Sequence, residues 1–137
     1  MTERHLSSKL GIKPGSTVSL IRPNPETLSQ IRQGSNINTF IDRIEKDSDV
    51  ILYWYDPTED IREKMLELQS QIRPNGRIWV IIPKKEVAKK QHLDIDWNQM
   101  QGEILKTHLV DNKVASINGE EYGTQFVIRK GFRDTVK

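Results

Sequence analysis

Apolar residues fall into short runs along this chain, separated by polar turns and by segments with helical spacing. The three clearest runs are Thr17–Ile21, Val50–Tyr55 and Arg77–Ile82, which are rich in β-branched and aromatic residues, as is typical of strands. Val50–Tyr55 is apolar or aromatic throughout, so we expect it at the centre of a sheet that is buried on both faces. Ile37–Ile41 predicts a further, weaker strand.

Helix-start signals follow two of these strands. Asn24-Pro25-Glu26 supplies an N-cap residue, a proline at the first helical position and an acidic first turn, and Gly34 is a suitable stop. Asp56-Pro57-Thr58-Glu59 repeats the signal, with Asp56 as the expected N-cap and Glu59 at the capping-box position. Apolar stripes at helical spacing then mark this second helix and a third one capped by Asp96, namely Ile61, Met65, Leu68 and Ile72, and Trp97, Met100 and Ile104.

This alternation of strands and helices predicts an α/β sheet. The chain ends with two more apolar runs, Val110–Ile117 and Gln125–Lys130, and the short glycine-containing link between them favours an antiparallel hairpin. A chain of 137 residues has the length of one domain. We therefore expect a flexible lead-in over residues 1–10, a single domain over residues 11–130 and a tail over residues 131–137.

Composition excludes several classes of function. The chain has no cysteine, which excludes disulfides, thiolate metal sites and thiol catalysis. His5, His92 and His108 are far apart without metal-site spacing, so no metal is expected, and no nucleophile elbow or phosphate-binding loop indicates a reaction. We assign no catalytic residue. Without a signal-peptide pattern or an apolar stretch near the ~20 residues of a membrane span, a cytoplasmic protein without membrane partners is expected.

The segment 72–85, IRPNGRIWVIIPKK, resembles the fifth-strand signature of class I methyltransferases, in which a loop with proline and glycine precedes a buried strand. Together with LGIKPGSTV, DVILYWY and LVDNKVASI, it is also similar to a family of short uncharacterised bacterial proteins that look like trimmed methyltransferase domains. The resemblance covers roughly residues 10–130. It implies a three-layer, Rossmann-like, mostly parallel sheet with a C-terminal antiparallel hairpin. Because only Asp42–Asp49 separates two of the expected strands, one edge strand should be missing.

The turn after the first strand departs from the enzymes of that class. They bind S-adenosylmethionine over a glycine-rich turn, where the backbone must approach the ligand closely. Here the turn is Arg22-Pro23-Asn24-Pro25, in which two prolines remove backbone donors, and Glu26 repels an anionic ligand. Conventional cofactor binding is therefore disfavoured. Asp42 lies about twenty residues beyond the strand, where an acid contacts ribose in dinucleotide sites, but a solvated loop acid is the other interpretation.

Ligands of open α/β sheets bind outside the carboxyl ends of the strands. The residues expected there are Arg22, Asn24, Asp56 and Lys84, flanked by Tyr53 and Tyr55, with Asp42 and Lys113 as further crevice candidates. Asp56 has a competing role as a helix cap. Lys113 either points into the crevice or pairs with Asp111.

These patterns favour a non-catalytic binding or interaction module on a degenerate methyltransferase-like fold, for which a homodimer is one possible assembly. The alternative is a methyltransferase with an atypical pocket, using Asp42 for S-adenosylmethionine and Asp56 near the reacting group. A weaker alternative is nucleic-acid binding through the four lysines of Lys84–Lys90. Because neither aromatic platforms nor a recognisable module accompany that run, a solvated face explains it as well.

Overall fold

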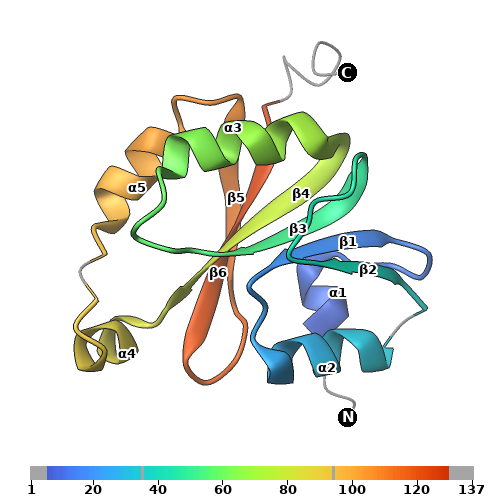
Figure 1. The fold of residues 1–137 in the computed structure, drawn as a ribbon, viewed down its shortest axis with the longest axis horizontal. Coiled ribbons are helices and arrows are strands. Elements are labelled where there is room, and N and C mark those ends of the chain that lie inside the picture. Colours follow the sequence, from blue (N-terminus) through green and yellow to red (C-terminus); the bar gives the residue numbers. More distant parts are fainter. Residues whose placement is uncertain (1–5, 35, 94, 130–137) are drawn as a thin grey trace.

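The computed structural model describes residues 6–34, 36–93 and 95–129. In this part of the chain, one six-stranded sheet carries helices on both faces (Figure 1). The strands are β1 (Thr17–Ile21), β2 (Asn38–Ile41), β3 (Ser48–Trp54), β4 (Ile72–Pro83), β5 (Leu109–Ser116) and β6 (Glu121–Ile128). The helices are α1 (Leu6–Leu10), α2 (Pro25–Gly34), α3 (Ile61–Gln71), α4 (Lys85–Lys90) and α5 (Trp97–Ile104).

The sheet is mostly parallel, as predicted. Its order is β2-β1-β3-β4-β6-β5, and the first four of these strands pair in parallel. β6 lies between β4 and β5 and runs antiparallel to both, which confirms the C-terminal antiparallel pair. Only six residues link β2 to β3, too few for a further helix and strand. The expected loss of one edge strand is therefore confirmed, and β2 forms that edge.

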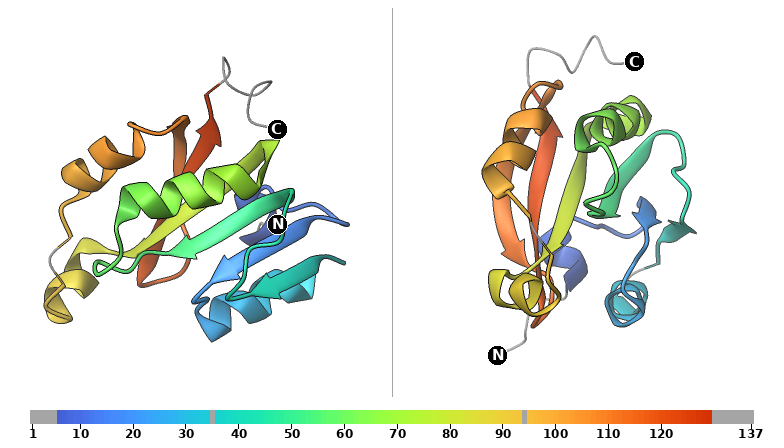
Figure 2. Two further views of the ribbon diagram at one scale, coloured as in Figure 1. Left: turned by 45° about the horizontal axis from the view of Figure 1, so that its top comes forward. Right: turned by 60° about the vertical axis from the view of Figure 1, so that its left-hand side comes forward.

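Helices lie on both faces of the sheet (Figure 2), and an apolar core lies on each face. Along β3, Val50, Leu52 and Trp54 face the core beneath α1 and α2, whereas Ile51 and Tyr53 face the core beneath α3 and α5. Side chains alternate between the faces of a strand. A strand covered on both faces therefore needs apolar residues at every position, which explains its unbroken apolar run.

The lead-in is shorter than predicted. Leu6–Leu10 forms α1, in which Leu10 is fully buried, so the prediction of a flexible segment over residues 1–10 is wrong for this part. The indole N–H of Trp79 donates to the carbonyl of Leu10 at 3.0 Å and ties α1 to the sheet. The four-residue spacing of Leu6 and Leu10 was the available signal. Residues 1–5 and the predicted tail over residues 131–137 lie outside the described residues.

The starts of β4 and β6 and the presence of α4 also differ from the prediction. β4 begins at Ile72, so it includes the proline-glycine segment that was expected as a loop before Arg77. β6 begins at Glu121, four residues before the expected start, because Tyr122 and Gly123 already pair with the end of β4. The loop between Ser116 and Glu121 is correspondingly short. Helix α4, which contains most of the lysine run, was not predicted because six residues carry little periodicity.

Candidate functional site

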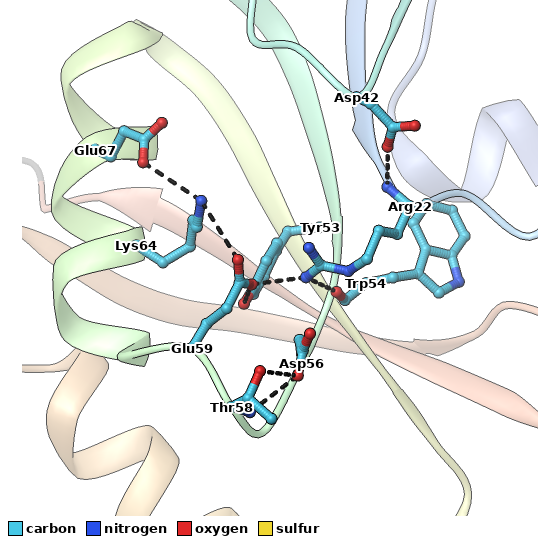
Figure 3. Close-up of polar contacts among 9 residues, drawn as sticks. All are labelled: Arg22, Asp42, Tyr53, Trp54, Asp56, Thr58, Glu59, Lys64 and Glu67. Carbon is cyan, nitrogen blue, oxygen red and sulfur yellow. Dashed lines mark hydrogen bonds and ion pairs between the residues drawn. The ribbon is translucent and has the colours of Figure 1, made fainter.

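The carboxyl ends of β1 and β2 hold two predicted site residues side by side (Figure 3). The backbone N–H of Arg22 donates to a carboxylate oxygen of Asp42 at 2.8 Å, and the N–H of Asp42 donates to the carbonyl of Leu20 at 2.7 Å. Arg22 and Asp42 both have a φ of 57°. This left-handed conformation is uncommon outside glycine. The backbone therefore turns sharply after β1 and again after β2. The Asp42 carboxylate joins these two turns through its hydrogen bond with the N–H of Arg22.

The side chain of Arg22 crosses from the end of β1 to the end of β3 (Figure 3). Its Nη2 donates to the carbonyl of Trp54 and to Oε1 of Glu59, both at 2.7 Å. Its guanidinium carbon lies 5.4 Å from the centre of the Tyr53 ring, which permits a cation–π contact. A single arginine thus occupies the space above the carboxyl ends of both strands.

Glu59 is the centre of this network. Its Oε1 also accepts a hydrogen bond from the hydroxyl of Tyr53 at 2.7 Å, and its Oε2 lies 3.7 Å from Nζ of Lys64. Partial burial acts to raise the pKa of Glu59, but the hydrogen bonds from Tyr53 and Arg22 and the charges of Arg22 and Lys64 outweigh it and lower that pKa. We name Arg22, Tyr53, Glu59 and Lys64 the Arg22 network.

The Arg22 network is unsuited to proton transfer near neutral pH. Burial, and then the hydrogen bond to ionised Glu59, raise the pKa of the Tyr53 hydroxyl above its ordinary value. Tyr53 therefore stays protonated while Glu59 stays ionised, whereas an effective general acid or base needs a pKa close to the working pH. Glu59 was not among the predicted site residues, and Tyr53 was expected only to flank them. Glu59 was interpreted as a capping residue, and the signal available for Tyr53 was a hydroxyl within a buried strand.

Asn24 and Asp56 have structural roles. Asn24 Oδ1 accepts from the N–H of Glu26 at 2.9 Å and caps α2, as predicted. The predicted cap of α3 is wrong, because Asp60 Oδ1 accepts from Glu63 at 3.1 Å while Glu59 turns toward Arg22. Asp56 instead accepts hydrogen bonds from the N–H and the hydroxyl of Thr58, at 2.9 and 2.7 Å, and these lower the pKa of Asp56.

The two lysine candidates lie apart from the Arg22 network. Lys84 follows β4, where its backbone N–H donates to the carbonyl of Glu120 at 2.8 Å. Lys113 lies within β5, and its Nζ is 5.8 Å from the centre of the Trp79 ring, which belongs to the core beneath α1 and α2. Neither predicted alternative for Lys113 therefore describes its recorded contact.

A hollow of about 290 Å³ lies between the ends of β3, β4 and β6. It is lined by Asn24, Tyr55, Pro83, Val87, Gln91, Leu93, Glu120 and Glu121.

Within the described residues there is no group of three or more metal-ligating side chains close enough to hold an ion. The same part of the chain contains no helix with the length and apolar character needed to cross a membrane.

Residues 7–130 match the family described as Protein of unknown function (DUF3052). The chain belongs to this family. The match covers nearly the same residues as the resemblance seen in the sequence, and it includes all of α1 except Leu6. A search of curated proteins found no match.

Solved methyltransferase structures share the fold of this DUF3052 protein. A putative type 11 methyltransferase from Sulfolobus solfataricus is 17% identical, with a TM-score of 0.57 over 92% of this chain and 90% of that one. A SAM-dependent methyltransferase from Aquifex aeolicus is 13% identical, with a TM-score of 0.62 over 88% and 86%. Geranyl diphosphate C-methyltransferase from Streptomyces coelicolor A3(2) is 10% identical, with a TM-score of 0.59 over 90% and 78%. These likenesses establish a Rossmann-like, methyltransferase-like fold.

Proposed function

We propose that this DUF3052 protein is a non-catalytic binding module built on a methyltransferase-like fold. The observation that carries the proposal is the position of Arg22. In the enzymes that the sequence resembles, S-adenosylmethionine lies over a glycine-rich turn after the first strand. Here the turn contains no glycine, and the Arg22 side chain crosses that region to the Trp54 carbonyl and Glu59.

Charge and hydrogen bonding support the same proposal. An adenosyl ligand over this turn would displace the Arg22 guanidinium and leave the Glu59 carboxylate without one of its donors. The backbone N–H of Arg22, which could otherwise contact a ligand, already donates to Asp42. Without Arg22, the partly buried Glu59 would lose a charge-assisted hydrogen bond, which is stronger than a neutral one.

Calorimetric titration with S-adenosylmethionine and S-adenosylhomocysteine tests the proposal. We expect no binding to the wild type at micromolar concentrations. Binding at micromolar affinity, or methyl transfer to any acceptor, would contradict a non-catalytic module without this cofactor. Arg22→Gly removes the side chain and suits the positive φ at this position, so it reports whether Arg22 itself excludes the ligand. Arg43→Gly is the control, since Arg43 lies in the neighbouring exposed loop.

A methyltransferase with an atypical pocket is the second candidate, because Asp42 follows β2 directly and lies beside the end of β1. That is the region in which an acid would contact the ribose of an adenosyl ligand. If this candidate is correct, S-adenosylhomocysteine raises the melting temperature of the wild type, and Asp42→Ala abolishes the increase. Asp47→Ala, which changes another loop aspartate with positive φ, should leave it unchanged.

A further inference from the structure

A second hollow, of about 560 Å³, lies between the end of β4, helix α4 and the start of α5. We name it the α4 hollow. Its apolar lining consists of Ile82, Pro83, Ala88, Leu93, Ile95, Trp97 and Tyr122. Ile95, Trp97 and Tyr122 are only partly buried, with their inner sides against the core beneath α3 and α5. These side chains therefore pack against the core on one side and offer apolar surface to a ligand on the other.

Among the residues that the structure describes, the charged side chains lining the α4 hollow are both lysines. Lys85 and Lys89 are four positions apart on α4, so they lie on the same face of the helix. Both side chains are exposed at the rim, and neither forms an ion pair with a residue that the structure describes. Like charges at this spacing repel each other. An anionic group between them would relieve that repulsion.

Neighbouring hollows carry the opposite charge. The hollow at the ends of β3 and β4 shares Pro83 and Leu93 with the α4 hollow, but its charged lining is Glu120 and Glu121. A third hollow, of about 490 Å³, lies between α3 and α5. Its carboxylates are Glu59, Asp60, Asp96 and Glu103. Of these three hollows, as lined by the described residues, the α4 hollow is therefore the one that favours an anionic group.

We propose that the α4 hollow binds an aliphatic carboxylate, with the carboxylate between Lys85 and Lys89 and the alkyl chain against Trp97 and Tyr122. This inference rests on the proposed function, because it names the ligand class of the binding module. Ligand sites are mostly apolar with a few polar groups that fix orientation, and the α4 hollow has this composition. The alkyl chain supplies affinity by leaving water, while the two lysines select the charge of its head group.

Decanoate is the probe, and its binding to the full chain can be followed by calorimetry and by the change in tryptophan fluorescence. We expect saturable binding that strengthens about fourfold for each methylene group between octanoate and decanoate. Binding should weaken as salt rises, because the charges at the rim are exposed. Decylamine and decanol share the alkyl chain without the negative charge, and both should bind more weakly than decanoate.

Lys85→Gln/Lys89→Gln should weaken decanoate binding about tenfold, as expected for the loss of two exposed ion pairs. The matched control is Lys13→Gln/Lys90→Gln, which removes the same charge from exposed lysines that do not line the α4 hollow. Equal binding of decanol and decanoate, or equal losses in the two double variants, would overturn the inference. These titrations contain no S-adenosylmethionine, so a negative result leaves the proposed function standing. Conversely, binding of S-adenosylmethionine in its own titration would overturn the proposed function. The affinity of the α4 hollow for decanoate would stay the same in that case.

Discussion

At the scale of residues, the Arg22 network joins three parts of the chain that are distant in sequence. Arg22 follows β1, Tyr53 lies in β3, and Glu59 precedes α3. Two donors converge on the same Glu59 oxygen at 2.7 Å each, and Lys64 approaches the other oxygen. A buried hydroxyl needs a partner, and Glu59 supplies one for Tyr53. The network therefore stabilises the turn that closes over the sheet.

Glu59→Gln should reduce the free energy of unfolding by about 1 kcal/mol at pH 7, allowing for solvent screening of partly exposed charges. Folding lowers the pKa of Glu59 below its ordinary value of 4.5. Its contribution to stability is therefore present above that value and is lost as the pH falls through the lowered pKa. Urea unfolding from about pH 6 to about pH 3 should show the difference between wild type and variant shrinking.

Glu63→Gln provides the control for this measurement, because Glu63 is exposed on the first turn of α3 and its side chain is outside the Arg22 network. Its stability relative to the wild type should change little over the same range of pH. A difference between wild type and Glu59→Gln that stays constant with pH would show that Glu59 is not held ionised by its neighbours.

At the scale of elements, helix ends depend on which acidic side chain is free to cap. The sequence before α3 offers Asp56, Glu59 and Asp60 within five positions. Glu59 is engaged by the tertiary contacts of Arg22 and Tyr53, whereas Asp56 closes a local turn with Thr58. Asp60 remains next to the first turn and accepts from the backbone of Glu63. The cap therefore lies four residues later than the sequence pattern indicated.

Asp60→Ala should reduce the free energy of unfolding by about 1 kcal/mol, the usual cost of losing an N-cap. Asp60→Asn is the matched variant, because asparagine caps a helix about as well as aspartate and should retain most of the stability. Thermal and urea unfolding measure both. Equal destabilisation by the two substitutions would assign the effect to the charge of Asp60 and not to its hydrogen bond with Glu63.

At the scale of the whole molecule, the two apolar cores share their strands. β3 and β4 contribute alternate residues to both cores, so neither helical layer can separate from the sheet without exposing strands that the other layer also covers. Small domains built in this way unfold as one unit. Even the five-residue α1 takes part, because Leu10 is fully buried and its carbonyl accepts from Trp79.

Leu10→Ala beneath α1 and Leu68→Ala beneath α3 should each lower the free energy of unfolding by about 2–4 kcal/mol, because each removes a fully buried side chain. Both variants should keep a single transition, with tryptophan fluorescence and far-UV circular dichroism changing together. Leu66→Ala, at a position that is 42% exposed on α3, is the control and should cost far less. Separate transitions for the two probes would show that the layers unfold independently.

Much of the fold could be predicted because its signals are local. The apolar run in β3 and the proline-glycine segment at the start of β4 identified the central strands, and the shortness of the link from β2 to β3 identified the lost edge. The start of β6 could not be predicted, because a strand beginning at Glu121 depends on pairing with β4. Helix α1 was missed because five residues carry too little periodicity.

The candidate site was less predictable than the fold. Arg22 and Asp56 were expected at the carboxyl ends of their strands, because strand direction alone decides where such residues lie. Asp42 was expected in the same crevice from its distance along the chain. Their hydrogen-bond partners depend on side-chain rotamers and on contacts between distant segments. Lys113 shows the same limit, since only the register of β5 against β6 carries its ammonium to the ring of Trp79.

By itself, the sequence determined the class of fold and the absence of a glycine turn after β1, because backbone conformation and strand burial follow from the types of neighbouring residues. Tertiary structure alone decided what fills that position. The Arg22 side chain reaches Glu59, which is 37 residues away in sequence, and only the parallel alignment of β1 and β3 brings the two together. The same folding unites α4, β4 and the start of α5 around the α4 hollow.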